Sequence, residues 1–266
     1  MLYHAYRGKG SYTPLWLKIQ KEEIQMRNLK RALSLALAAI MLIGMMVVSA
    51  SATGLDDFSD KDKVVNKDAV SMLVSLGIIE GKPDGSYGPT ENVDRAQMAK
   101  MLSVIMNKGV DNSALYQSVN SGLTDITSHW AKGHINYCYT TGIIAGRGNG
   151  TFDPSATVTA LEAAKMLLVA VGYDPKIEGF EGADWAINVS VRADEQGIFE
   201  GFTKDLSAPL NRDDAALLIY KALDVEMIQS YPTNKYPIVY SDHRTILSDK
   251  YGVIKVEGVV TPNEWA

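Results

Sequence analysis

The feature that most constrains the fold of this chain is one stretch whose pattern occurs three times. Its clearest copy, Gly142 to Leu168, predicts the end of one helix, a glycine-rich turn and the start of a second helix. Gly142 suits a helix end, because glycine adopts a positive φ without steric cost. The second helix starts at a capping box, Thr159-Ala160-Leu161-Glu162, in which the Thr and Glu side chains each satisfy a free backbone N–H.

The other two copies keep the same order of signals. Asp94 and Gln97 form a second capping box, and Asn211 can cap the third helix with Asp214 at the reciprocal position. Each cap follows a Gly-Ile-Ile-x-Gly or Gly-Ile-Phe-x-Gly segment. Three copies in register, at a period of roughly 55–65 residues, indicate a repeat array whose neighbours share one core.

Further motifs flank these copies, and they are Phe58-Ser59-Asp60, Asp94-Arg95-Ala96-Gln97, Leu123-Thr124-Asp125, His129-Trp130-Ala131 and Gly150-Thr151-Phe152-Asp153-Pro154. Together they resemble the S-layer homology (SLH) domain, over about residues 55–225. The resemblance implies a mainly α fold in which three helix-loop-helix repeats form a pseudo-trimer. It also implies binding of an anionic, often pyruvylated, secondary cell-wall polysaccharide attached to peptidoglycan. The sequence departs from the family where Val65 stands in place of a tryptophan, and where the third turn, Phe202 to Ala208, is shorter.

The repeats predict the domain boundaries. We place them at residues 55–108, 123–173 and 180–225, with a polar connector and a short helix over residues 109–122. Residues 226–266 contain a linker rich in Tyr-Pro pairs, followed by alternating β-branched and polar residues from Tyr251 to Val260 that predict a strand. A lone strand is unstable. This segment therefore either starts a β-rich following domain or packs back on the repeats.

The amino-terminal part predicts export. Residues 1–25 show no periodicity, and we interpret them as an extension upstream of the natural start at Met26. Residues 26–52 have the basic, apolar and small-residue parts of a signal peptide, with cleavage expected after Ala52. The apolar part is almost long enough for a spanning helix. The Ala-x-Ala site favours cleavage, so we expect a secreted protein on the bacterial cell wall with no stable membrane insertion.

Charge and cysteine content exclude several classes of protein. Residues 53–266 carry 19 basic and 29 acidic residues, an excess that argues against nonspecific binding of nucleic acid. The single cysteine, Cys138, allows no internal disulfide, and we expect it to be buried. The four histidines show no metal-ligand spacing, and no nucleophile–base pattern is visible. We therefore expect no cofactor, no metal and no catalytic residues.

Two arginines are the main candidate ligand contacts. Arg95 and Arg212 each follow a helix cap, where free N–H groups, the helix dipole and a guanidinium would together form an anion site. The alternative is that each arginine pairs with an aspartate between repeats. The resemblance favours ligand contact, since both match the family's arginine. The second repeat has Ala160 at this position, so we expect its site to be weak or absent, at an exposed helix start.

Aromatic and acidic side chains complete the candidate site. Trp130 and Trp185 begin their helices and could stack on a sugar ring or fill the repeat interface. Asp60 and Asp125 match the family aspartate and could accept hydrogen bonds from the sugar or cap a helix. In the third repeat this aspartate is ambiguous between Glu181 and Asp184.

Two classes of function remain open. The first is a non-catalytic anchor that tethers an exported protein to the wall. The second is the amino-terminal targeting part of an exported glycan-acting enzyme, or of a self-assembling S-layer protein, whose active or lattice domain would lie beyond residue 266.

Overall fold

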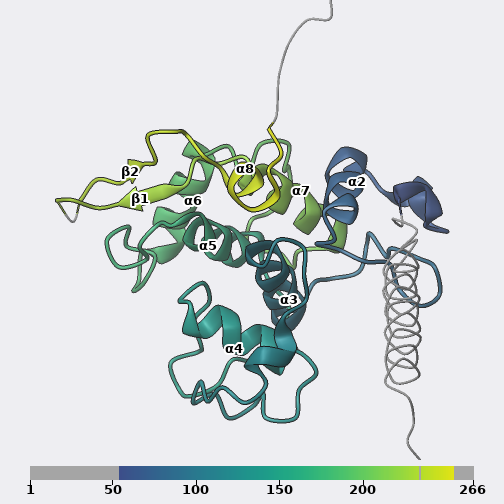
Figure 1. The fold of residues 1–266 in the computed structure, drawn as a ribbon, viewed down its shortest axis with the longest axis horizontal. Coiled ribbons are helices and arrows are strands. Elements are labelled where there is room, and N and C mark those ends of the chain that lie inside the picture. Colours follow the sequence, from purple (N-terminus) through teal and green to yellow (C-terminus); the bar gives the residue numbers. More distant parts are fainter. Residues whose placement is uncertain (1–53, 234, 255–266) are drawn as a thin grey trace, which may run out of the picture. The chain divides into compact units, whose positions relative to one another are not determined.

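The computed structural model describes residues 54–233 and 235–254, so the predicted upstream extension and signal peptide lie outside the described residues. The described part contains seven α-helices and a two-stranded antiparallel sheet, which confirms the predicted mainly α fold (Figure 1). Within these residues, no helix has the length and apolar character needed to cross a membrane.

Each repeat contributes two helices joined by a glycine-rich loop. The first repeat supplies α2 (Lys67–Ser75) and α3 (Arg95–Met106), the second α4 (Lys132–Thr140) and α5 (Ala160–Val171), and the third α6 (Trp185–Glu195) and α7 (Arg212–Ala222). The three caps form as predicted, because the side chains of Asp94, Thr159 and Asn211 each accept a hydrogen bond from the backbone N–H three residues later. Asp214 does not complete a reciprocal box, because its carboxylate pairs with Lys204 instead.

The helices pair between repeats rather than within them. The second helix of each repeat packs on the first helix of the next, which gives the pairs α3–α4, α5–α6 and α7–α2 (Figure 1). The last pair closes the array on itself: the backbone N–H and the side-chain amide of Asn66, at the start of α2, donate to the Asp213 carboxylate on α7. Repeats that share helix pairs in a closed cycle have one continuous core, as a pseudo-trimer requires.

A ring of three backbone hydrogen bonds lies where the loops of the three repeats meet. The N–H of Val93 donates to the carbonyl of Leu210 at 2.8 Å, Leu210 donates to Val158 at 2.8 Å, and Val158 donates to Val93 at 2.9 Å. All three side chains are at most 2% exposed. We call these three residues the central ring. Each repeat supplies one donor and one acceptor, so the ring closes only when all three repeats are present.

The helix starts that lie beside the central ring form backbone hydrogen bonds with the loop of the neighbouring repeat. The N–H of Arg95 donates to Ala156 O at 2.9 Å, and that of Arg212 donates to Glu91 O at 2.9 Å. In α5 the N–H of Leu161 donates to Leu206 O at 3.1 Å. The first N–H groups of a helix have no partner within the helix, and here the next repeat supplies one.

The connector and the carboxyl-terminal segment both pack on the repeats. A short 3₁₀ helix, η3 (Ser113–Tyr116), confirms the helix predicted in the connector. After the third repeat come β1 (Ile228–Ser230), β2 (Ile238–Val239) and α8 (Ile246–Tyr251). Ile246 and Leu247 are each 2% exposed, and the N–H of Leu247 donates to Leu223 O at 3.0 Å. Within this segment, α8 therefore packs back on the third repeat.

The strand predicted from Tyr251 is wrong at its start. Tyr251 ends α8, which Thr245 caps by accepting from Ser248 N at 3.2 Å and which Gly252 ends at a φ of 65°. Residues 252–254 carry no strand, and residues 255–260 lie outside the described residues.

We predict that the central ring makes the three repeats unfold as one unit. Leu210→Ala removes a buried side chain and should lower the free energy of unfolding by about 2–5 kcal/mol. Hydrogen exchange of the amides of Val93, Val158 and Leu210, which belong to three different repeats, should report the same decrease. Unchanged protection at Val93 and Val158 in this variant would show that the repeats unfold separately.

Candidate functional site

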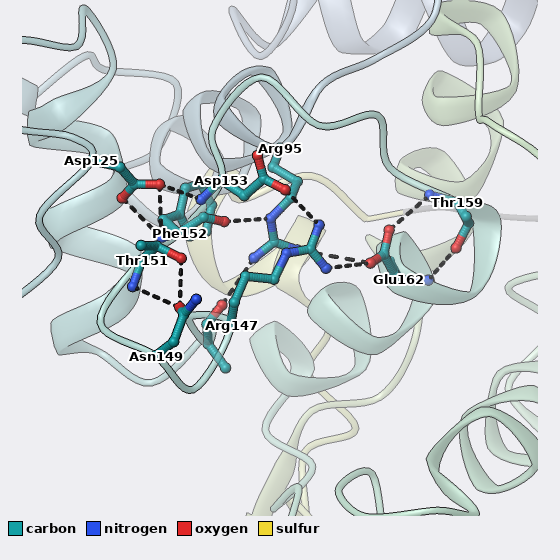
Figure 2. Close-up of polar contacts among 10 residues, drawn as sticks. Arg95, Asp125, Arg147, Asn149, Thr151, Phe152, Asp153, Thr159 and Glu162 are labelled. Carbon is teal, nitrogen blue, oxygen red and sulfur yellow. Dashed lines mark hydrogen bonds and ion pairs between the residues drawn. The ribbon is translucent and has the colours of Figure 1, made fainter.

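The side chain of Arg95 reaches from the first repeat into the loop of the second (Figure 2). Its Nε donates to Phe152 O at 2.9 Å and its Nη2 to Ala145 O at 3.0 Å, while the guanidinium lies 4.4 Å from the centre of the Phe152 ring. The residue is only 5% exposed. Arg95 therefore holds the loop of the next repeat in place and presents only an edge to solvent.

Arg212 repeats this arrangement between the third and first repeats. Its Nε donates to Tyr87 O at 2.8 Å and its Nη2 to Glu80 O at 3.1 Å, and the guanidinium lies 4.8 Å from the centre of the Tyr87 ring. The residue is half-buried, so it is more accessible than Arg95. Among the residues that the structure describes, neither arginine forms an ion pair with an aspartate, because loop carbonyls accept hydrogen bonds from its Nε and Nη2 atoms instead.

The predicted contribution of free helix N–H groups to the anion site is wrong. In α3 and α7 the first two N–H groups donate to the neighbouring loop, and the third donates to the cap residue. These amides are used because the three helix starts converge on the central ring. The first three N–H groups of α3 and α7 are therefore not free to bind an anion.

Burial changes the electrostatics of Arg95. Burial and the nearby Arg147 guanidinium lower its pKa to about 10, although the Glu162 carboxylate opposes this effect. Arg95 thus stays protonated at neutral pH.

Two grooves collect the predicted site residues. The first groove lies beside the loop of the first repeat, and it is lined by residues 78–83, Gln97, Lys100, Met101, Trp130 and Arg212. The second groove lies beside the loop of the second repeat, and it is lined by residues 143–148, Arg95, Glu162, Lys165, Met166, Phe180, Glu181, Gly182 and Trp185. Their volumes are about 230 Å³ and about 600 Å³.

The two grooves have the same construction. Each takes its loop and its second helix from one repeat, its tryptophan from the next and its arginine from the remaining one. Trp130 and Arg212 therefore share the first groove, while Trp185 and Arg95 share the second. All three repeats contribute to each groove.

The tryptophans differ in exposure. Trp130 is 56% exposed, whereas Trp185 is half-buried with Lys165 Nζ 5.6 Å from its ring centre. Sequence reasoning missed Lys100 and Lys165, which line the two grooves at the same position of the repeated helix. The repeat alignment could have found them, because a shared charge on successive copies is a signal of a shared site.

Asp60 and Asp125 fasten the loops of their own repeats. The Asp60 carboxylate accepts from Tyr87 N at 2.7 Å and Gly88 N at 2.9 Å. Asp125 does the same with Phe152 N at 2.9 Å and Asp153 N at 2.7 Å (Figure 2). Burial raises the pKa of each carboxyl, but these N–H donors outweigh it and hold the pKa below 3.8. Neither carboxylate makes a side-chain cap to a helix; contact with a sugar stays a prediction.

The corresponding positions around the third repeat are apolar. Val65 stands where the other repeats have tryptophan, Ala160 where they have arginine, Leu217 where they have lysine and Phe202 where they have the loop cation. The sequence predicted a weak or absent site for the second repeat, but the groove beside the loop of that repeat takes its arginine, Arg95, from the first repeat. The strength of binding at each position stays a prediction. The expected exposure of Ala160 is wrong, since it is 0% exposed, because the α5 start lies against the loop that holds Leu206.

The comparison with known families rests on the repeats. A family model described as the S-layer homology domain matches residues 57–99 and 122–164. The chain belongs to the SLH domain family. The third repeat lies outside the two matched segments, and its helix pairing and its place in the central ring make it part of the same array.

Relatives of this SLH chain include surface proteins and proteins named as enzymes. It is 30% identical over 206 residues to a cell surface protein of Thermoanaerobacter kivui, which covers 77% of this chain and 26% of that protein. It is 34% identical over 113 residues to an S-layer protein of Bacillus licheniformis, and this match covers 42% of this chain and 12% of that protein. It is also 30% identical over 173 residues to an amylopullulanase of Thermoanaerobacterium thermosulfurigenes, and this match covers 59% of this chain and 9% of that protein.

The chain thus spans about a quarter or less of the length of these relatives. SLH domains bind cell-wall polymers, and the surface-protein relatives indicate the cell envelope and imply a role in wall anchoring.

We predict that Asp60 and Asp125 stabilise the fold in a pH-dependent way. Because the pKa of each carboxyl is lower in the folded protein than its ordinary 3.8, each stabilises the fold above pH 3.8 and loses this effect as the pH falls below it. Asp60→Asn and Asp125→Asn should each cost about 1 kcal/mol at pH 7, since these carboxylates are partly exposed. Each variant should also lose less stability than wild type on acidification to pH 2.

The measurement is urea denaturation at pH 7 and at pH 2. Asp62→Asn is the matched control, because Asp62 is an exposed aspartate of the same repeat as Asp60. Equal effects of Asp60→Asn and Asp62→Asn would contradict the loop-fastening role.

Proposed function

We propose that this chain anchors an exported protein non-covalently to the bacterial cell wall, by binding an anionic, often pyruvylated, secondary cell-wall polysaccharide in the first and second grooves. The observation that carries the proposal is that a tryptophan and at least three cationic side chains converge in each groove from different repeats. The same positions around the third repeat carry none of them. A structural role alone would not require the cations and the aromatic ring to be present together in two grooves and absent together from the corresponding positions around the third repeat.

The chemistry of each groove suits an acidic sugar. The face of an indole ring packs on the apolar face of a pyranose, and its N–H can donate outward. Lysine and arginine provide charge-assisted hydrogen bonds to a carboxylate, and these are stronger than neutral hydrogen bonds. In the second groove Lys165 lies over the Trp185 ring, so a sugar packed on that ring would place an acidic substituent near the ammonium.

We also propose that the chain does not turn its ligand over. Ser103, His134 and Asp111 form a chain of contacts, with Ser103 Oγ 2.7 Å from His134 Nδ1 and His134 Nε2 3.6 Å from Asp111 Oδ2. This set is unsuited to nucleophilic catalysis, because Ser103 and His134 are each 4% exposed and line neither groove. Among the described residues, no group of His, Cys, Asp and Glu could hold a metal ion.

A second candidate function is compatible with this anchor. The relative named amylopullulanase indicates that a similar segment occurs in an enzyme, of which it covers 9%. This chain could equally be the targeting part of a glycan-acting enzyme or of an S-layer protein. The same grooves would bind the wall in each case.

We predict that the groove lysines contribute to wall binding. A hydrogen bond to a charged group contributes about 1.5–3 kcal/mol, so Lys100→Ala and Lys165→Ala should each weaken binding to purified wall sacculi by roughly 10- to 100-fold. The double variant should barely sediment with sacculi. Both lysines lie away from the central ring, so the variants should fold. Arg95→Ala is a poorer test, because this buried residue holds a loop.

The matched control is Val65→Ala, which changes an 82% exposed residue at the position that corresponds to Trp130 and Trp185. Its binding should equal that of wild type. Equal loss in the control, or full binding by the double lysine variant, would contradict the assignment of the grooves. Release of reducing sugar from sacculi would contradict the non-catalytic proposal.

A further inference from the structure

We infer that the two grooves are unequal anion sites, set apart by one pair of corresponding residues, Gln97 in the first groove and Glu162 in the second. The first groove is the stronger site for a carboxylate of the wall polymer, and the second groove is the weaker one. This inference rests on the proposed function and adds which groove binds the carboxylate more strongly.

Gln97 and Glu162 occupy the same place in the repeat. Each is the third residue of its helix, and each completes a capping box: Gln97 Oε1 accepts from Asp94 N at 3.0 Å, and Glu162 Oε2 accepts from Thr159 N at 3.1 Å. The backbone contact is therefore shared. What differs is that one side chain brings a neutral amide to its groove and the other a carboxylate.

In the second groove the carboxylate is turned toward the arginines (Figure 2). Glu162 Oε1 lies 3.3 Å from Arg147 Nη1 and 4.0 Å from Arg95 Nη1. The Nε and Nη2 atoms of Arg95 already donate to loop carbonyls, and Arg147 also lies 3.5 Å from Asp153. Since the protein itself supplies a carboxylate here, an incoming anion must compete with it.

In the first groove the corresponding arginine, Arg212, has no such carboxylate partner among the described residues. Arg212 uses Nε and Nη2 for loop carbonyls. Lys82 does pair with Glu91, and Lys100 with Glu80 at 3.0 Å, but the side chains of these two glutamates are 53% and 72% exposed, against 21% for Glu162, so water screens them more. Arg212 therefore remains the uncompensated cation that a carboxylate can approach.

The charge of the lining residues agrees with this difference. The first groove has three cations and one carboxylate, Lys82, Lys100, Arg212 and Glu80. The second has three cations and two carboxylates, Arg95, Arg147, Lys165, Glu162 and Glu181. The first groove is thus more positive by one charge, and attraction between exposed charges is weakened by salt. Anion binding in the first groove should be stronger and more salt-dependent.

Exchanging the two residues tests the inference. Gln97→Glu is made in a protein whose second groove is disabled by Trp185→Ala and Lys165→Ala. Glu162→Gln is made in a protein whose first groove is disabled by Trp130→Ala and Lys100→Ala. Both exchanges keep a side-chain oxygen that can accept the capping hydrogen bond, so helix starts should stay intact. The probe is wall sacculi carrying a pyruvylated polysaccharide, before and after mild acid removes the pyruvate.

Opposite effects are expected from the two exchanges. Gln97→Glu should weaken binding to untreated sacculi by about tenfold, and Glu162→Gln should strengthen it by a similar factor, as one nearby charge warrants. On acid-treated sacculi both effects should shrink to about twofold or less. The two single-groove parents provide an independent measurement, since the protein with only the first groove should lose affinity more steeply as salt rises.

The results separate this inference from the proposed function. If the parents bind sacculi but the exchanges act in the same direction, or if their salt dependences are equal, the inequality of the grooves is overturned. If wild type and both parents fail to bind sacculi, the proposed function fails and the inference fails with it. Melting curves of every variant must match those of its parent.

Discussion

The architecture depends on the hydrogen bonds of the central ring. In an isolated repeat, the buried backbone N–H and C=O of its central-ring residue, Val93, Val158 or Leu210, would lack the hydrogen-bond partners that the other two repeats supply. An unpaired buried polar group costs about 1–3 kcal/mol, and each repeat offers only two short helices to offset this cost. The N–H groups at the helix starts add to the same demand. Three repeats satisfy all of these groups at once, so the array closes as one unit.

This closure decides where a ligand can bind. Because the helix-start amides are used to join repeats, they are not available to an anion, and we therefore propose recognition in the grooves between repeats. Arg95 and Arg212 connect the two roles, since each guanidinium holds a loop and lines a groove. Around the third repeat, Val65 and Ala160 lack the groups that would bind an acidic sugar.

The local signals in the sequence predicted much of the fold. The caps at Asp94, Thr159 and Asn211 were predictable because a cap depends on residues within one helical turn. The strand expected from Tyr251 failed because the alternating pattern overlapped a helix whose cap, Thr245, lies further upstream. The local sequence pattern did not show whether the helix cap at Thr245 or the alternation from Tyr251 would decide the structure of this segment.

The sequence predicted which residues line the candidate site better than it predicted which of them share a groove. Arg95, Arg212, Trp130 and Trp185 all line grooves, but which arginine joins which tryptophan depends on the cyclic closure of the repeats. Asp60 and Asp125 were seen as ligand or cap residues, whereas the loop amides that they fasten lie more than twenty residues away in sequence.

The central claim is that wall polymer binds in the first and second grooves of a closed three-repeat array. The most direct measurement is a titration of isotope-labelled protein with solubilised wall polysaccharide, followed by the NMR signals of the indole N–H groups. The account predicts that the signals of Trp130 and Trp185 shift, with those of the central-ring amides of Val93, Val158 and Leu210 unchanged. Binding that leaves both indole signals in place, or that shifts the amide of Val65 instead, would contradict it.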